Sequence, residues 1–333
     1  MFGLIRRAKP LSCTLVSTKP YSSVPSVSVQ EIARLRKDSG ASIQKCKEAL
    51  EQSNGSMKDA IELLRKRGQT INARGSDASK FGGSRVSASV TPDSRRAVLS
   101  RTTSLTDFAS ESELFVKFSE SVNRSICAGD ISEKSRIPSD LKLSVPISDQ
   151  IHGQNLDQVV SELSSILSEP VTLSDVDVVE GDHVSIYVHG KSSYSTHVGS
   201  MGVACALRFK GYVSLNPEQT RFLSCLSDRI ARQILATGPR YISPGDIPQM
   251  VIDKERDLLS SRVTNKAALD KAFAGHMKKF VSETCLLNME WIIPFPDLDI
   301  PEGASVADVM RVSFTKIGVD QDGIKIDRFV IRK

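Results

Sequence analysis

The sequence lacks the motifs of covalent, phosphate-binding and metal chemistry. It contains no G-x-x-x-x-G-K-[ST], no H-E-x-x-H and no G-x-S-x-G, which are typical of phosphate-binding loops, zinc proteases and serine hydrolases. It also has no apolar run near the ~18 residues that a membrane helix needs. We therefore expect no catalytic residues, no cofactor and no direct contact with a membrane.

Cysteine and histidine are also sparse. The six cysteines form no C-x-x-C pair, which argues against a zinc site and against a disulfide framework and favours a reducing compartment. His183 and His189 are six residues apart and could share one face of a strand. No third ligand stands at a useful spacing, so we interpret both as ordinary histidines and expect no metal site.

Acidic residues are missing from the first thirty positions. The first is Glu31, whereas basic residues such as Arg6, Arg7 and Lys9 and many Ser and Thr precede it. This composition is typical of a mitochondrial or plastid transit peptide. We therefore predict that residues 1–27 are a targeting leader. The alternative is a disordered basic tail.

The overall composition is that of a globular protein. Hydrophobic residues make up 40% and charged residues 25% of the 333 positions, enough for two or three compact units. The net charge of +5 is spread among interleaved acidic residues, and five Tyr and one Trp provide little surface for stacking bases. We expect no direct contact with nucleic acid.

Residues 28–68 have the punctuation of three short helices. A capping box at Ser28 and Glu31 begins the first helix, and Gly40 can end it in the left-handed conformation. Three helices of this length are a minimal independent bundle.

The second and third of these helices follow without long loops. Ser42 can cap the second, in which Ile43, Cys46 and Leu50 recur on one face. The third is expected to close at Gly68.

The rest of the chain mixes helices and strands without a regular βαβ period, so the predicted class is α+β. Residues 69–95 are expected to be a linker that becomes the first strand of a β-hairpin. We expect a core of two subdomains, residues 96–168 and 169–333, with a protruding antiparallel helical hairpin at 246–283.

Individual core elements are predicted from their periodicity and end signals. We expect helices over residues 114–126 and 156–167, between Asn216 and Gly238, and after Ser305, and strands over 97–101, 184–188, 202–208 and 328–331.

Several blocks of the sequence resemble one protein family. Residues 35–50 read L-R-K-D-S-G-A-S-I-Q-K-C-K-E-A-L, and Thr106-Asp107-Phe108, Tyr187-Val188-His189-Gly190 and Arg328-Phe329-Val330 follow at intervals. In order and approximate spacing these blocks resemble those of elongation factor Ts. The loop at 191–200 is longer than in bacterial members and resembles that of mitochondrial ones. The resemblance covers residues 30–331.

The resemblance implies a guanine-nucleotide exchange factor for elongation factor Tu, acting in an organelle without any covalent step. It makes Phe108 an aromatic wedge that enters the partner, with Asp107 beside it making polar contacts. Without the resemblance, Phe108 would more often be a residue of the protein's own core. His189 and Gly190 would face another part of the partner's GTPase domain, or be an ordinary strand end with a turn glycine.

The resemblance also implies a contact region on the helical bundle, facing the partner's GTPase domain. The alternative is a solvated charged face with one core residue. The residues concerned are Arg36, Ile43, Gln44 and Lys47.

Two other functions remain open from the residues alone. The bundle at 28–68 also resembles ubiquitin-associated domains, which would make the protein an interaction adaptor. Arg65-Lys66-Arg67 and the positive balance would suit a basic RNA-binding factor. Neither alternative accounts for the blocks around Phe108 and His189.

Overall fold

Two antiparallel sheets form the centre of the molecule. The computed structural model describes residues 27–74, 82–129, 131, 137–143, 147–210, 215–260, 266–320 and 323–333. The first sheet has the strand order β3-β2-β1-β5, and its strands are β1 (Gly83–Val90), β2 (Arg96–Ser104), β3 (Thr172–Glu180) and β5 (Val198–Gly199). The second has the order β4-β6-β7, with β4 (His183–His189), β6 (Met201–Phe209) and β7 (Ile324–Arg332).

The two sheets pack face to face through small side chains. Ala204 and Ala206 of β6 lie in one buried cluster with Val86 and Leu99 of the first sheet. A Cβ atom on Gly202 would lie 2.8 Å from Cγ1 of Val86 and 2.9 Å from Cδ1 of Leu99, so only glycine fits there. Small residues therefore set the close spacing of the sheets.

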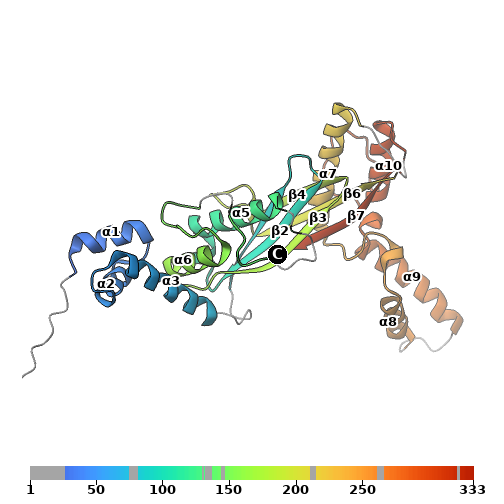
Figure 1. Cartoon of the computed structure of the whole chain (residues 1–333). Coiled ribbons are helices and arrows are strands. Elements are labelled where there is room, and N and C mark those ends of the chain that lie inside the picture. The colour runs from blue at the N-terminus through green and yellow to red at the C-terminus, as the bar shows by residue number, and fades with distance from the viewer. Residues whose placement is uncertain are drawn as a thin grey trace, which may run out of the picture.

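Helices cover the outer face of each sheet (Figure 1). On the first sheet, α5 (Glu113–Ala128) and α6 (Leu156–Leu167) bury Val98 and Val178. On the second sheet, α7 (Pro217–Thr237) and α10 (Val306–Lys316) bury residues of β6 and β7 such as Cys205 and Ile324. The result is a helix–sheet–sheet–helix order of layers, which confirms the predicted α+β class.

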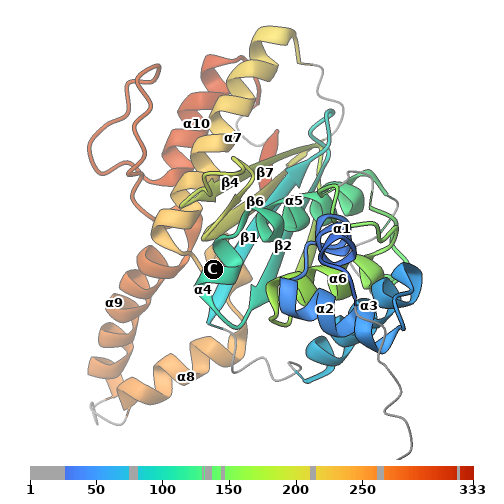
Figure 2. The same ribbon diagram turned by 90° about the vertical axis from the view of Figure 1, so that its left-hand side faces the viewer.

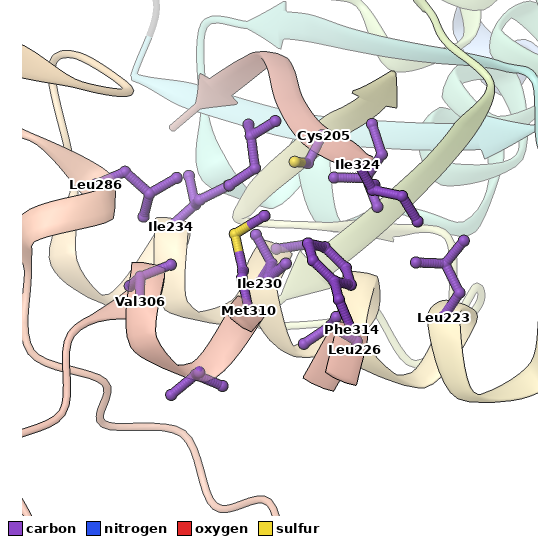
Figure 3. Packing of buried hydrophobic residues seen from close by; sticks show 14 of the residues in the cluster. Cys205, Leu223, Leu226, Ile230, Ile234, Leu286, Val306, Met310, Phe314 and Ile324 are labelled. Atoms are coloured by element: carbon purple, nitrogen blue, oxygen red, sulfur yellow. The ribbon is translucent and has the colours of Figure 1, made fainter. Parts of the chain in front are cut away.

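The core under α7 and α10 is the larger of the two helix-covered cores (Figure 3). Leu226 and Ile230 of α7 meet Met310 and Phe314 of α10 there. Cys205 of β6 is completely buried among them, and burial raises the pKa of its thiol to about 12. This cysteine is a packing residue with no reactive thiolate at neutral pH.

The predicted ends of the core helices are confirmed. Asn216 and Gln219 form a capping box at the start of α7, and Gly238 ends that helix at a φ of 61°. Ser305 and Asp308 form a second capping box at α10. Short side chains that accept from the first free N–H groups thus mark where each helix begins.

Strand β3 lies beyond the subdomain boundary expected at residue 168 but belongs to the first sheet. The strand still pairs with β2, with Thr172 opposite Thr103, and Val171 and Val178 lie in the core under α5 and α6. The chain passes to the second sheet between β3 and β4. The boundary was expected directly after the helix at 156–167, because the sequence does not indicate that the next strand returns to pair with β2.

The amino-terminal bundle consists of α1 (Val29–Ser39), α2 (Ile43–Gln52) and α3 (Met57–Arg74). The Ser28–Glu31 capping box is present, and Gly40 ends α1 at a φ of 66°. The small core of the bundle consists of Leu35, Ala41, Cys46, Ala49, Leu50, Ala60 and Leu64. The predicted leader, apart from residue 27, and residues 75–81 of the predicted linker lie outside the described residues.

The helix end predicted at Gly68 is wrong, because α3 continues to Arg74. A Cβ atom on Gly68 would lie 1.9 Å from the backbone oxygen of Ser161 in α6. The glycine therefore allows α3 to cross α6 at very short range. Arg65 of α3 adds an ion pair to Glu162 of α6 at 2.6 Å, so the bundle is docked on the core.

The predicted helical hairpin is confirmed and protrudes from the core (Figure 2). It consists of α8 (Gln249–Ser260) and α9 (Lys266–Thr284), with the short 3-10 helices η2 (Pro244–Asp246) and η3 (Leu286–Asn288) at its base. His276 lies 2.7 Å from Glu255, and the guanidinium of Arg256 stacks over Phe273. These contacts join the two helices along the hairpin.

Candidate functional site

Phe108 is the most exposed aromatic side chain in the part of the chain that the structure describes. It lies in the first turn of α4 (Asp107–Glu111) and is 89% exposed, whereas the next residues, Ala109 and Ser110, are buried. The helix therefore turns its small residues inward and Phe108 outward. This exposure contradicts the alternative that Phe108 belongs to the protein's own core.

The short helix α4 is held at both ends. Thr106 caps its start: the hydroxyl accepts from the N–H of Ala109 at 3.2 Å. The same hydroxyl donates to Glu169 at 2.7 Å, and the N–H of Thr106 donates to the other oxygen of Glu169 at 3.0 Å. At the far end, Arg85 of β1 pairs with Glu111 at 2.7 Å.

Glu169 and Arg85 were not predicted as site residues from the sequence. Glu169 is 63 positions from Thr106, and nothing in the spacing of either segment pairs them. Arg85 lies on a strand whose alternation predicts only its face. Both contacts arise from the way β1, α4 and the end of α6 meet in three dimensions.

Asp107 is exposed beside Phe108 at the start of α4. Its carboxylate lies at the positive end of the helix, where a negative charge is favourable. The backbone oxygen of Asp107 accepts from Ser110 at 2.9 Å. The side chains of Asp107 and Phe108 are thus both available to a partner.

On the bundle, the four predicted contact residues are all exposed: Arg36, Ile43, Gln44 and Lys47. Gln44 donates to Glu48 at 2.8 Å, and Lys47 lies 3.9 Å from Glu51.

The burial pattern of α2 corrects the expectation that Ile43 shares the core face of Cys46 and Leu50. Cys46 and Leu50 are completely buried, but Ile43, the first residue of the helix, is 55% exposed. Ile43 instead lines a shallow hollow of about 430 Å³ with Val29 and Arg36.

His189 and Gly190 lie at the end of β4. His189 is exposed, and the hydroxyl of Tyr187 lies 3.4 Å from its Nδ1. Gly190 has a φ of 60°, and a Cβ atom there would lie 2.2 Å from Oγ of Ser200. The glycine is therefore required by the turn itself, whatever a partner adds.

His183 and His189 do not form a joint metal site. They lie at opposite ends of β4, about 20 Å apart by strand rise. His183 is buried and lies 3.0 Å from the hydroxyl of Ser227. Within the described residues, no group of three or more His, Cys, Asp or Glu could hold a metal ion.

Two of the three predicted regions lie near each other. Gly83 of β1 lies close to the backbone oxygen of Thr106. Three residues further along β1, Val86 pairs with Gly199. Gly199 in turn lies close to the backbone oxygen of His189. Three residues of a strand span about 10 Å. The α4 and His189 regions are thus neighbours along β1, whereas the bundle is docked on α6 through α3, as the ribbon shows (Figure 2).

The site offers an exposed aromatic, polar groups and backbone turns. An exposed aromatic side chain with polar groups around it is suited to contact with a partner protein. Among the described residues, no helix is both long and apolar enough to cross a bilayer.

Comparisons with known proteins identify what the chain is similar to. Residues 105–317 match the family model for "Elongation factor TS", a segment that includes α4 and β4. The chain is 25% identical over 272 residues to the elongation factor Ts of Chloroherpeton thalassium, covering 80% of this chain and 87% of that protein. It is 27% identical over 312 residues to that of Symbiobacterium thermophilum, covering 91% and 90%.

Proposed function

The chain belongs to the elongation factor Ts family, and from this premise we propose that it is the guanine-nucleotide exchange factor for the elongation factor Tu of an organelle. Membership makes it a translation elongation factor that promotes nucleotide exchange and catalyses no covalent chemistry. The exposure of Phe108 is the observation that carries the mechanism proposed below.

An exchange factor has to compete with bound nucleotide. A GTPase that holds GDP with nanomolar affinity gains about 12 kcal/mol from it. The factor offsets this by binding the nucleotide-free form more tightly than the GDP-bound form, and the antagonism is reciprocal. Any group that the factor buries only in the nucleotide-free complex contributes to that difference.

Phe108 is suited to this task. An aromatic side chain that is 89% exposed in the free protein has most of its apolar surface still to bury. Complete burial of such a side chain contributes about 1.5–3 kcal/mol. In the proposed mechanism Phe108 inserts between helices of the GTPase and shifts the elements that hold the magnesium ion, and Asp107 makes polar contacts beside it.

The other predicted residues provide affinity around this wedge. His189 and Gly190 lie at the end of β4, about 10 Å from the α4 region as measured along β1. They would contact a second part of the GTPase domain. The exposed face of the bundle would contact a third, through Arg36, Ile43, Gln44 and Lys47.

The organelle is proposed to be the mitochondrion. This proposal is supported by the basic, acid-free composition of residues 1–27 and by the length of the loop at 191–200. Import of the full chain into isolated mitochondria, but not of residues 28–333, would support it. Import into isolated plastids alone would overturn it in favour of the plastid.

The direct test is release of fluorescent GDP from organellar elongation factor Tu, with residues 28–333 as the exchange factor. We expect strong acceleration by this protein, and about a tenfold or greater loss with Phe108→Ala, because the buried aromatic surface is lost. Thermal stability should remain nearly the same, because Phe108 is exposed.

The matched control is Ile292→Ala, which removes another exposed apolar side chain, 55% exposed, outside all three regions. It should leave exchange unchanged. An absence of acceleration by the folded protein would refute the proposed function. Normal exchange by the Phe108→Ala variant would refute the role of the wedge.

A further inference from the structure

Glu169 connects the end of α6 to the residue that begins α4. One carboxylate oxygen accepts from the Thr106 N–H at 3.0 Å, and the other accepts from the Thr106 hydroxyl at 2.7 Å. Hydrogen bonds to an ionised acceptor are roughly twice as strong as neutral ones. The two contacts together fix both the backbone and the side chain of Thr106.

The hydroxyl of Thr106 has two tasks that depend on each other. Its hydrogen points to Glu169, which leaves a lone pair free to accept from the N–H of Ala109 at 3.2 Å. That bond is the cap of α4. Glu169 therefore holds the hydroxyl in a rotation that leaves a lone pair free to cap the helix carrying Phe108.

The helix needs this support because it is very short. With five residues, α4 is far below the ~12–15 residues at which an isolated helix becomes even marginally stable in water. Only Ala109 and Ser110 are buried in it. Its conformation, and with it the direction of Phe108, depends on contacts at its two ends.

Glu169 is itself held in place by its surroundings. Ser168, which ends α6, has a φ of 62°, and its hydroxyl accepts from Lys45 of the bundle at 2.6 Å. Pro170, which is buried, restricts Glu169 to extended backbone. Two residues further on, Thr172 pairs with Thr103 of β2, close to Thr106 in the chain. The backbone on both sides of Glu169 is therefore restricted, which limits the positions that its carboxylate can take.

From this geometry we propose that Glu169 is a positioning residue, which preorganises Phe108 for entry into the partner. The proposal rests on the proposed exchange function. Free Thr106 and α4 would sample many conformations, and ordering them on binding would reduce the rate of the step in which Phe108 enters. Glu169 removes that penalty before the partner arrives.

The test measures GDP release from elongation factor Tu over a range of exchange-factor concentrations. For Glu169→Ala we expect the maximal rate to fall about five- to tenfold, with the half-saturating concentration nearly unchanged, because ordering is now required within the complex. Glu169→Gln, which retains one good acceptor, should be intermediate. Thermal denaturation checks that both variants remain folded.

Glu180→Ala is the matched control. It removes an exposed carboxylate from the opposite end of β3, where Glu180 pairs with Arg96 at 3.1 Å and does not touch Thr106. Its exchange rate should equal that of the unmodified protein. A Glu169→Ala variant that exchanges as fast as the control would overturn the proposal.

A double-mutant cycle with Phe108→Ala separates positioning from direct contact. If Glu169 acts through Phe108, its removal should add almost nothing once Phe108 is gone. Full additivity would mean that Glu169 contacts the partner independently, and would overturn the positioning role. If the unmodified protein accelerates release and Phe108→Ala does not, a failure here leaves the exchange function intact.

Discussion

At the scale of single residues, His183 is a polar side chain on an otherwise ordinary strand. It is 8% exposed, and its Nε2 lies 3.0 Å from the hydroxyl of Ser227 on α7. Burial lowers the pKa of His183 below its usual value, because the charged imidazolium is poorly solvated there. The folded protein therefore holds this side chain neutral.

This pKa shift predicts that the protein loses stability in mild acid. Below about pH 6.5 the unfolded chain protonates this histidine, whereas the folded chain does so only at lower pH. The contribution of neutral His183 to the free energy of unfolding is fully present above about pH 6.5. It is lost as the pH falls through the lower pKa of His183 in the folded state. Urea denaturation between pH 7.5 and 5 should show the decline.

His183→Gln provides the comparison, because glutamine does not titrate and can still reach Ser227. The pH dependence of its free energy of unfolding should be shallower than that of the unmodified protein over the same range. Identical slopes for the two proteins would contradict the prediction. Because His183 is far along β4 from His189, exchange activity should be retained at pH 7.5.

At the scale of elements, Gly68 shows how one residue determines the placement of two helices. It lies within α3, and the backbone oxygen of Ser161 in α6 occupies the place that a Cβ atom would need, at 1.9 Å. Beyond this crossing, Asn72 of α3 accepts from the hydroxyl of Ser164 at 2.7 Å and from the N–H of Val171 at 3.0 Å. The last turns of α3 thus belong to the core as much as to the bundle.

We expect Gly68→Ala to destabilise the protein by about 1–3 kcal/mol, because the methyl group forces α3 away from α6. The matched control is Gly275→Ala in α9, where a Cβ atom would meet nothing within 4 Å. That change should stabilise by about 0.5–1 kcal/mol, since alanine favours a helix over glycine. Chemical denaturation gives both values. A neutral or stabilising Gly68→Ala would refute the close crossing.

The same elements show what could be predicted from the sequence. Caps such as Ser28, Asn216 and Ser305 are local signals, so the helix starts were predicted correctly. Gly68 was misinterpreted because a helix-ending glycine and a close-packed glycine look alike in one segment. Glu169 was missed because its partner lies 63 positions away.

The arrangement of the sheets lay beyond the sequence for a related reason. Alternation along β4 predicts that Val184, Ile186 and Val188 point inward. Val184 and Val188 are buried, and Ile186 is partly buried against the same cluster. It did not indicate that they face a second sheet, because the same alternation suits packing on helices or on strands. The exposure of Phe108 came from the family resemblance, since composition alone favours burial of phenylalanine.

At the scale of the whole molecule, the proposed partner-binding regions are parts of one connected body. The bundle is tied to α6 by the Arg65–Glu162 ion pair and by Lys45, which donates to the backbone oxygen of Ser165 at 2.8 Å. Two residues beyond the end of α6 lies Glu169, which holds α4. The bundle face and Phe108 are thus presented at a fixed separation, so binding at one raises the effective concentration of the other.

This arrangement predicts a division of tasks that kinetics can resolve. The exposed face of Ile43 would bind the partner in both its GDP-bound and nucleotide-free forms, whereas Phe108 would enter only as nucleotide leaves. We therefore expect Ile43→Asp to raise the half-saturating concentration about tenfold, as the loss of a buried isoleucine would, and to leave the maximal rate of GDP release unchanged. The change is compatible with folding, because Asp is favourable in the first turn of a helix.

Lys58→Ala is the control for charge, since it also lowers the net charge by one and affects an exposed residue of the bundle outside the proposed contact face. It should leave both kinetic parameters unchanged. If Ile43→Asp instead lowered the maximal rate and left the half-saturating concentration alone, the bundle would take part in expelling the nucleotide. The docking of α3 on α6 would then couple contacts at the bundle to the entry of Phe108. The proposal that the bundle only anchors the partner would be wrong.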